Sequence, residues 1–274
     1  MKSKSLVASF NYKKAKLEVH VLANIFDIGR VSPSPRPRFL INSGNEYMVG
    51  TALPYFPRGG LPRVNNVLGG PGSWQMSTSW GGMAAGDNMV YPVQTVDGEL
   101  ATRYPELSTW VREHVPPVTW DTCREEDEKQ GARLRRLHLT RGSVRCATGA
   151  CVWTPIPDVD HDQPHGFSLG VLHTVAPYDS DPDRDLRLAS CFTNCLRVAA
   201  SRPEVTDTSF SVVTSLLGTG VKSIDRAHCA GILRGCLDNN DDNKDDTFND
   251  RNCSVELVLQ SEQTFSEVLP ALDQ

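Results

Sequence analysis

The stretch of this chain that most constrains its fold is an apolar run followed by a glycine turn and a helical pattern. The run is Phe210–Leu217, the turn is Gly218–Gly220, and the helical pattern starts at Ser223. In a strand–turn–helix of this kind, backbone N–H groups and the positive end of the helix dipole point at the turn, which predicts a site for a phosphate or diphosphate. The alternative is a plain connecting turn in which glycine supplies a positive φ.

The rest of the chain alternates between strand and helix patterns. The other expected strands are Lys16–Phe26, Phe39–Ile41, Phe167–Val175 and Ser254–Leu259. The other expected helices are Val96–Glu113, Asp183–Ser201 and Thr264–Leu272. Such an alternation predicts an α/β sandwich with helices on both faces of a mostly parallel sheet.

Size and charge place the chain among globular domains. Its 274 residues, 39% of them apolar, are enough for one large domain or two small ones. The net charge is −5 without a basic stripe, so we expect no direct nucleic-acid partner. No run suits a membrane span, and the lysine-rich segment Met1–Leu17 lacks the apolar core of a secretory signal. We therefore expect a cytoplasmic monomer with a solvated leader; the mitochondrion and the nucleus are the alternative locations.

The cysteines and the acidic segments do not form a metal-binding pattern. We expect the eight cysteines to be reduced thiols, and Cys191 and Cys195 have no second pair that would complete a zinc site. In the acidic run Asp238–Asp250, Asn243 and Asn249 stand where a calcium loop needs glycine and glutamate. We expect neither a metal nor a cofactor.

Three segments interrupt the alternation. Residues 46–95 are rich in glycine, proline and aromatic residues, residues 121–136 are dense in charge, and residues 238–252 are acidic. The first of them is longer than an ordinary loop. We interpret residues 1–274 as a single domain that carries these segments as insertions.

Short motifs occur along the chain in a specific order. They are Asp27-Ile28, INSGN at Ile41–Asn45, Val96-Asp97-Gly98, CATGA at Cys146–Ala150, LHTVAP at Leu172–Pro177, the helix segment Phe192–Ala200, and GTGV at Gly218–Val221. In this order they resemble the motifs of macrodomains, the ADP-ribose-binding α/β family, and in particular its hydrolytic, MacroD-like branch. The resemblance spans Lys16–Leu272 and implies a three-layer α/β/α sandwich with a mixed, mostly parallel central sheet.

The resemblance also implies how each part of ADP-ribose is bound. Asp27 would accept a hydrogen bond from the adenine amino group, and Asn42 would contact a ribose hydroxyl, because an amide donates and accepts at once. Backbone N–H groups of Gly218–Val221 would hold the diphosphate. The implied substrate-binding residues are Asp27, Ile28, Asn42, Gly98, Gly218, Thr219, Gly220, Val221 and Lys222.

Asn45 and Asp97 are the implied catalytic pair. Asn45 would hold the distal ribose, and Asp97 would activate a water molecule as a general base. Asp87 is the alternative carboxylate, and a helix N-cap is the alternative role of Asp97. We expect His173, in an apolar strand, to be a hydrogen-bonded core residue rather than a base.

Two departures from the family pattern affect the phosphate-binding loops. The family's glycine run before Val-Asp-Gly is replaced by Gln94-Thr95, and glycines occur instead within residues 46–95. That insertion therefore forms either the first phosphate loop or a lid. Lys222 stands where the family often has an aromatic residue, which adds a cation near the diphosphate.

These observations favour an ADP-ribose-binding hydrolase. The expected reaction removes an ester-linked group, either from O-acetyl-ADP-ribose or from a protein that carries mono-ADP-ribose on a carboxylate. The partners would be ADP-ribose, its esters and ADP-ribosylated proteins. A non-catalytic ADP-ribose reader and an ADP-ribose 1″-phosphate phosphatase are the alternatives.

Overall fold

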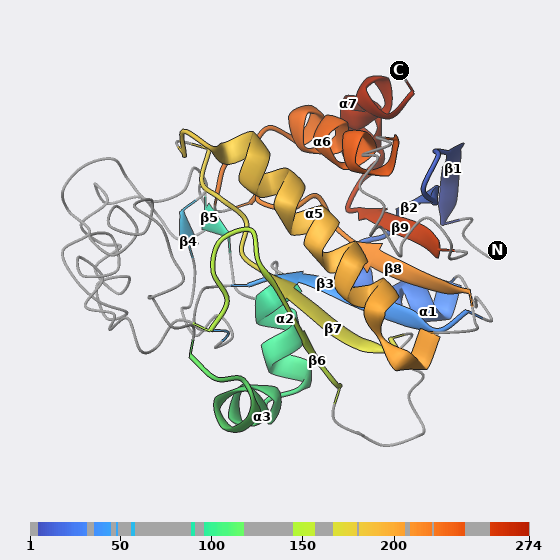
Figure 1. Cartoon of the computed structure of the whole chain (residues 1–274). Coiled ribbons are helices and arrows are strands. Elements are labelled where there is room, and N and C mark those ends of the chain that lie inside the picture. Colours follow the sequence, from blue (N-terminus) through green and yellow to red (C-terminus); the bar gives the residue numbers. More distant parts are fainter. Residues whose placement is uncertain are drawn as a thin grey trace.

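The computed structural model has a seven-stranded sheet with helices packed on both faces (Figure 1). It describes residues 5–31, 36–44, 48, 56–57, 89–90, 96–117, 145–156, 167–179, 181–205, 209–220, 222–238 and 253–273. The strands of the sheet are β1 (Leu6–Asn11), β2 (Lys16–Val21), β3 (Arg38–Ser43), β6 (Cys151–Thr154), β7 (Gly170–Thr174), β8 (Phe210–Thr214) and β9 (Cys253–Leu259). A separate two-stranded ribbon pairs β4 (Phe56–Pro57) with β5 (Met89–Val90).

The described helical elements alternate with the strands, as expected. They are η1 (Ile25–Asp27), α1 (Ile28–Val31), α2 (Val96–Arg103), α3 (Leu107–His114), α5 (Arg184–Ser201), η6 (Pro203–Val205), α6 (Arg226–Asp238) and α7 (Glu262–Leu272). Among the described residues, no helix combines the length and the apolar character needed to cross a membrane.

Most of the sheet is parallel. Its strand order is β1-β2-β9-β8-β3-β7-β6. The five strands from β2 to β7 in this order run parallel, whereas β1 and β6 are antiparallel to their neighbours. The carboxyl ends of the five parallel strands therefore lie together along one end of the sheet, referred to below as its carboxyl edge. Open α/β sheets bind ligands at this end.

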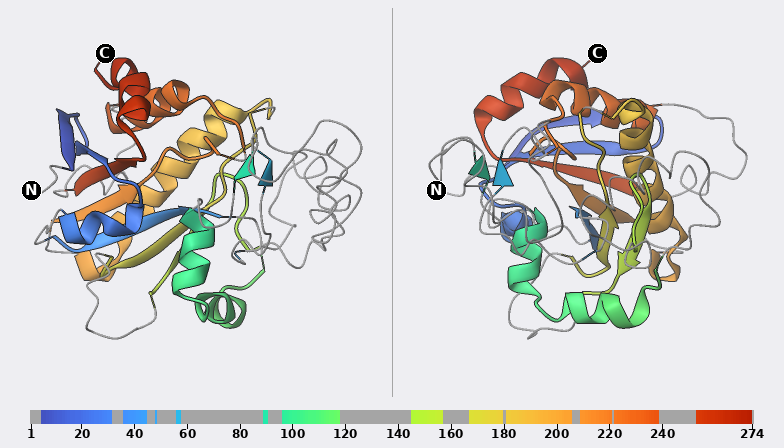
Figure 2. Two further views of the ribbon diagram at one scale, coloured as in Figure 1. Left: turned by 180° about the vertical axis from the view of Figure 1, so that it is seen from behind. Right: turned by 90° about the vertical axis from the view of Figure 1, so that its left-hand side faces the viewer.

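The alternation of side chains along each strand divides the core into two layers. In β3, Phe39 and Ile41 pack with α5, α6 and α7, whereas Leu40 packs on the other side with residues of η1, α1, α2 and α3. Figure 1 and Figure 2 show these two groups of helices on opposite sides of the sheet. The predicted three-layer sandwich with a mixed, mostly parallel sheet is thus confirmed.

Some predicted boundaries were wrong, each for a local reason. Leu6–Asn11 is not a solvated leader but an edge strand paired with β2. The strand expected to reach Phe26 ends at Val21, because the Asn24 side chain accepts a hydrogen bond from the Phe26 N–H and starts η1. The helix expected over Val96–Glu113 is two helices, since Pro105, which lies between them, has no N–H to continue the first.

The start of the helix after β8 also differs from the prediction. Helix α6 begins at Arg226 rather than Ser223, and Ser223 has a φ of +63°. The carboxylate of Asp225 accepts a hydrogen bond from the His228 N–H and so caps the helix. The residues between Gly218 and Asp225 therefore form a longer loop than the sequence indicated.

Several predictions fall outside the described residues. They concern Asn45, Asp87, Val221, most of residues 46–95, the whole of residues 121–136 and residues 239–252.

Candidate functional site

Two of the predicted site residues contact each other at the carboxyl end of β3. The Nδ2 atom of Asn42 donates to Oδ1 of Asp97 at 2.9 Å. Asn42 is fully buried in β3, and Asp97, in the first turn of α2, is only 8% exposed. The fold thus joins an amide and a carboxylate that lie 55 residues apart in the sequence.

The side-chain amide of Asn42 also begins a series of polar contacts that crosses the neighbouring strands of the sheet. Nδ2 of Asn42 lies 3.2 Å from Nδ1 of His173 on β7, and Nε2 of His173 lies 2.9 Å from the Thr154 hydroxyl on β6. Burial lowers the pKa of His173 to about 3, so this imidazole is neutral at physiological pH. The expectation that His173 is a hydrogen-bonded core residue is confirmed.

The glycine of the INSGN motif, Gly44, lies close to both Asn42 and Asp97. A Cβ atom at this position would lie 3.2 Å from Oδ1 of Asp97 and 3.3 Å from Nδ2 of Asn42. Its N–H donates to the Thr174 carbonyl at 2.9 Å, which fixes the chain as it leaves β3. A side chain here would press on the Asn42–Asp97 pair, which would have to shift by a few tenths of an ångström.

The loop between β8 and α6 presents unused backbone donors. The Ile224 N–H donates to the Gly218 carbonyl and the Ser223 N–H to the Gly220 carbonyl, both at 3.1 Å, and these bonds close the loop. Within the described residues, the N–H groups of Thr219, Gly220 and Lys222 donate no hydrogen bond. Such a run of free donors is able to bind an anion.

The two described glycines of this loop differ in what a side chain at each position would meet. Gly218 has a φ of +75°, and a Cβ there would lie 2.6 Å from Cδ1 of Ile224, so the fold itself requires glycine. Gly220 is exposed, and a Cβ there would contact nothing within 4 Å. Packing therefore does not explain Gly220, whereas close approach of a ligand to the backbone would.

Lys222 is held by the loop that follows β7. Its Nζ atom lies 3.6 Å from the centre of the Tyr178 ring, and its carbonyl accepts a hydrogen bond from the Asp179 N–H at 2.9 Å. Tyr178 directly follows the LHTVAP motif but was not among the residues predicted for the site. The β8–α6 loop thus carries a cation whose position is fixed by Tyr178.

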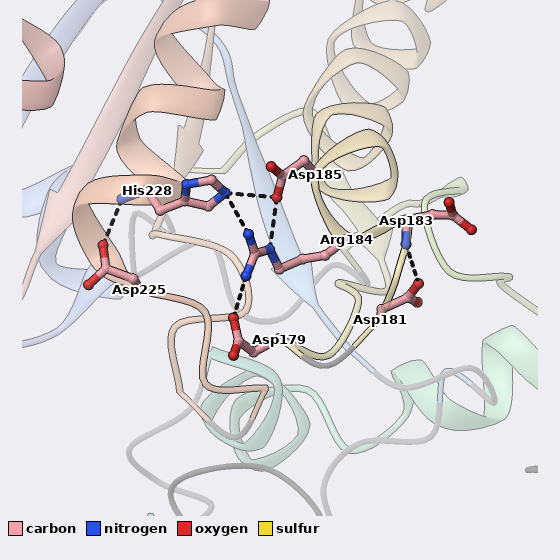
Figure 3. Close-up of polar contacts among 7 residues, drawn as sticks. All are labelled: Asp179, Asp181, Asp183, Arg184, Asp185, Asp225 and His228. Atoms are coloured by element: carbon pink, nitrogen blue, oxygen red, sulfur yellow. Dashed lines mark hydrogen bonds and ion pairs between the residues drawn. The ribbon is translucent and has the colours of Figure 1, made fainter.

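A network of charged residues lies next to the loop that follows β7 and the loop between β8 and α6 (Figure 3). Arg184 at the start of α5 donates to Asp179 at 2.6 Å and to Asp185 at 2.8 Å. Asp185 also lies 2.7 Å from Nε2 of His228 on α6. The hydrogen bonds from Arg184 and His228 lower the pKa of Asp185. The network links the first turns of α5 and α6, and through Asp179 it reaches the backbone of Lys222.

The residues predicted for the adenine lie after β2. Asp27 ends η1, its carboxylate is 41% exposed, and Nη1 of Arg30 lies 3.6 Å from it. Ile28 is fully buried among core residues of the layer that contains α2. Asp27 therefore presents an accessible carboxylate at the carboxyl edge of the sheet, whereas the Ile28 side chain belongs to the core.

Of the predicted site residues that the structure describes, Asn42 lies near the carboxyl end of β3 and Asp97 and Gly98 lie in the first turn of α2, whereas the others follow β2 (Asp27, Ile28) or β8 (Gly218, Thr219, Gly220, Lys222). Gly98 lies in the first turn of α2, where its carbonyl accepts a hydrogen bond from the Thr102 hydroxyl. The roles assigned to the predicted substrate-binding and catalytic residues remain predictions.

One group of side chains among the described residues has the ligand types of a metal site, namely Glu18, His20 and Glu256. Arg38 donates to both oxygens of Glu256, at 2.8 and 3.1 Å, and Lys16 pairs with Glu18. The carboxylates are thus already neutralised by cations. We interpret this group as a charge-balanced part of the sheet.

The comparisons with known proteins concern the fold. No protein-family model matches this sequence, and no curated protein sequence matches it. Among solved structures, the chain is similar to the Oceanobacillus iheyensis macrodomain with ADP, at 17% identity and a TM-score of 0.53, over 97% of this chain and 94% of that one. A mutant of that macrodomain with ADPR gives 19% identity and a TM-score of 0.52, over 97% and 96% of the two chains. The similarity covers nearly the whole of both chains, and this protein therefore has the macrodomain fold.

Proposed function

We propose that this protein binds ADP-ribose and hydrolyses an ester bond attached to its distal ribose. The observation that carries the binding half is the β8–α6 loop, where the N–H groups of Thr219, Gly220 and Lys222 are free within the described residues. The similar Oceanobacillus structures hold ADP or ADPR on the same fold. The diphosphate of ADP-ribose is the anion that this loop would bind.

The Asn42–Asp97 pair supports the catalytic half. Asp97 is a nearly buried carboxylate at the carboxyl edge of the sheet, held by a hydrogen bond from Asn42. A carboxylate in this position accepts a proton from water while the water oxygen attacks the ester carbonyl, and the ribose oxygen then leaves with a proton. Asn45, which follows Gly44 in the sequence, is the proposed ligand of the distal ribose.

The test is turnover of two ester substrates. Purified protein is incubated with O-acetyl-ADP-ribose, and separately with a protein that carries mono-ADP-ribose on a glutamate, and the release of ADP-ribose is followed. We expect Asp97→Asn to lower kcat by about 10²–10⁴-fold while leaving affinity nearly unchanged. Asp273→Asn, at the end of α7, is the matched control and should keep wild-type turnover.

A non-catalytic reader of ADP-ribose is the second candidate. It is favoured by the fact that the Asp97 carboxylate is already engaged by Asn42 inside the protein. A reader would bind ADP-ribose and turn over neither substrate. Binding without turnover in the wild type would therefore replace the hydrolase proposal with this one.

A further inference from the structure

The hydrogen bonds that surround Asn42 allow only one orientation of its amide. A single atom of that amide faces both Oδ1 of Asp97 at 2.9 Å and Nδ1 of His173 at 3.2 Å. If this atom were the oxygen, it would lie against an ionised carboxylate. It must therefore be Nδ2, which donates one hydrogen to Asp97 and the other to His173.

This orientation fixes the protonation of His173. Nδ1 of His173 has to accept the Asn42 hydrogen, so the proton of the neutral imidazole is on Nε2. Nε2–H then donates to the Thr154 hydroxyl, which lies 2.9 Å away. The three residues of this hydrogen-bond series that lie beyond Asp97 are at least nine-tenths buried; they are Asn42, His173 and Thr154.

The opposite arrangement would remove the hydrogen bond from Asn42 to Asp97. With the proton on Nδ1, His173 would face the Asn42 amide as a donor, and the amide would turn its oxygen toward both neighbours. Asp97 would then lose the hydrogen bond from Asn42 and face the amide oxygen instead. A Cβ atom at Gly44 would lie 3.2 Å from Oδ1 of Asp97 and 3.3 Å from Nδ2 of Asn42, so the carboxylate and the amide meet directly beside this glycine.

We infer that His173 is a positioning residue: its Nε2-protonated form sets the orientation of the Asn42 amide, and that amide holds the Asp97 carboxylate in place. Thr154 contributes by accepting the Nε2 hydrogen. Neither His173 nor Thr154 touches the ligand in this account, and both act through Asn42. The turnover part of this inference rests on the proposed function, whereas the hydrogen-bond part does not.

The experiment removes the Thr154 hydroxyl, the acceptor at the far end of this series of hydrogen bonds. Thr154→Val keeps the shape of the side chain and deletes the hydroxyl, while Thr154→Ser restores it as the matched control. Long-range ¹H–¹⁵N NMR of the imidazole reports which nitrogen carries the proton. We expect the Nε2–H form in wild type and in Thr154→Ser, and a measurable population of the Nδ1–H form in Thr154→Val.

The same variants are assayed for ADP-ribose affinity and ester turnover. We expect Thr154→Val to lower kcat by roughly 2- to 30-fold, the range for residues that act through a partner, with affinity nearly unchanged and with full rescue in Thr154→Ser. An Nδ1–H form in the wild type would overturn the inference, as would a change in tautomer that leaves kcat unaltered.

Two controls keep the result decisive. If Thr154→Val does not fold, His173→Asn replaces it, because its amide oxygen can accept from Asn42 without contacting Thr154; the inference then expects the Asn42 side-chain hydrogens to stay protected from exchange, and rapid exchange would contradict it. If the wild type shows no turnover, the proposed hydrolase has failed, and the imidazole spectrum still decides the hydrogen-bond arrangement.

Discussion

The ammonium group of Lys222 lies 3.6 Å from the centre of the Tyr178 ring, and this contact joins the loop after β8 to the loop after β7. A hydrogen bond from the Asp179 N–H to the Lys222 carbonyl adds a second connection between the same loops. The position of the cation is therefore fixed, and it belongs to the same loop as the N–H groups of Thr219 and Gly220. Its contribution to ligand binding is expected to be electrostatic.

Replacing Lys222 by Met should weaken ADP-ribose binding by about 0.2–1 kcal/mol, the value of an exposed ion pair. The dependence of affinity on salt concentration should also decrease, because screening acts on the charge that has been removed. Titrations at low and at moderate ionic strength measure both effects. Lys16→Met is the control, since Lys16 begins β2 at the opposite edge of the sheet. Equal losses in the two variants would argue against a specific role of Lys222.

The two glycines of the same loop should separate stability from binding. Gly218→Ala should destabilise the protein by at least about 1 kcal/mol, because its φ is +75° and the new methyl group would meet Ile224. Gly220→Val should leave the melting temperature nearly unchanged, since a Cβ there has no neighbour within 4 Å.

Binding should respond in the opposite way at Gly220. Gly220→Val should weaken ADP-ribose binding at least tenfold, because its side chain occupies the space through which a diphosphate reaches the backbone. Gly235→Ala, on α6, adds a side chain at another position where a Cβ meets nothing within 4 Å, and it serves as the control that should bind normally. Normal binding by Gly220→Val would show that the ligand does not approach this backbone.

His173 should make the protein less stable in acid. Its pKa is about 3 in the folded state and near 6.5 when exposed, so the unfolded chain binds the extra proton between these values. This group's contribution is therefore fully present above pH 6.5 and falls as the pH decreases, by up to about 1.4 kcal/mol per pH unit. Urea unfolding of wild type and His173→Asn at pH 7 and pH 5 should show a smaller pH dependence in the variant. His114→Gln, at an exposed position, should keep the wild-type dependence.

The buried pair of Arg38 and Glu256 should be costly to break. Arg38 is 3% exposed and donates to both carboxylate oxygens, and the Ser211 hydroxyl donates to the same carboxylate. Glu256→Gln leaves a buried guanidinium without its counter-charge, and we expect a loss of about 3–5 kcal/mol in the free energy of unfolding.

An exposed ion pair provides the comparison for that loss. Arg226 and Glu267 lie 2.7 Å apart with both side chains about four-tenths exposed. Glu267→Gln should therefore lower the free energy of unfolding far less than Glu256→Gln does, because solvent screens an exposed pair. Similar losses in the Glu256 and Glu267 variants would contradict the account of the buried pair.

The sequence predicted the fold well because its signals are local. Apolar runs such as Phe210–Thr214 and one-sided patterns such as Arg184–Ser201 depend on residues close together in the chain. The edge strand Leu6–Asn11 was missed because it is half-exposed and its pattern is weak. The break at Pro105 was visible in the sequence but was outweighed by the apolar spacing around it.

The site was less predictable because its contacts join distant residues. The resemblance pointed to Asn42 and Asp97 separately, but their direct hydrogen bond depends on the packing of α2 against β3. The same holds for Thr154, whose role follows from the pairing of β6 with β7. The contact of Lys222 with Tyr178 depends on how two loops close, which no periodicity encodes.

The most direct test of the central claim is a calorimetric titration of the wild-type protein and of Gly220→Val with ADP-ribose. We expect saturable binding to the wild type, and at least tenfold weaker binding to a Gly220→Val variant that melts at the wild-type temperature. Absence of binding to a folded wild-type protein would contradict the claim, and the macrodomain fold would then serve another ligand.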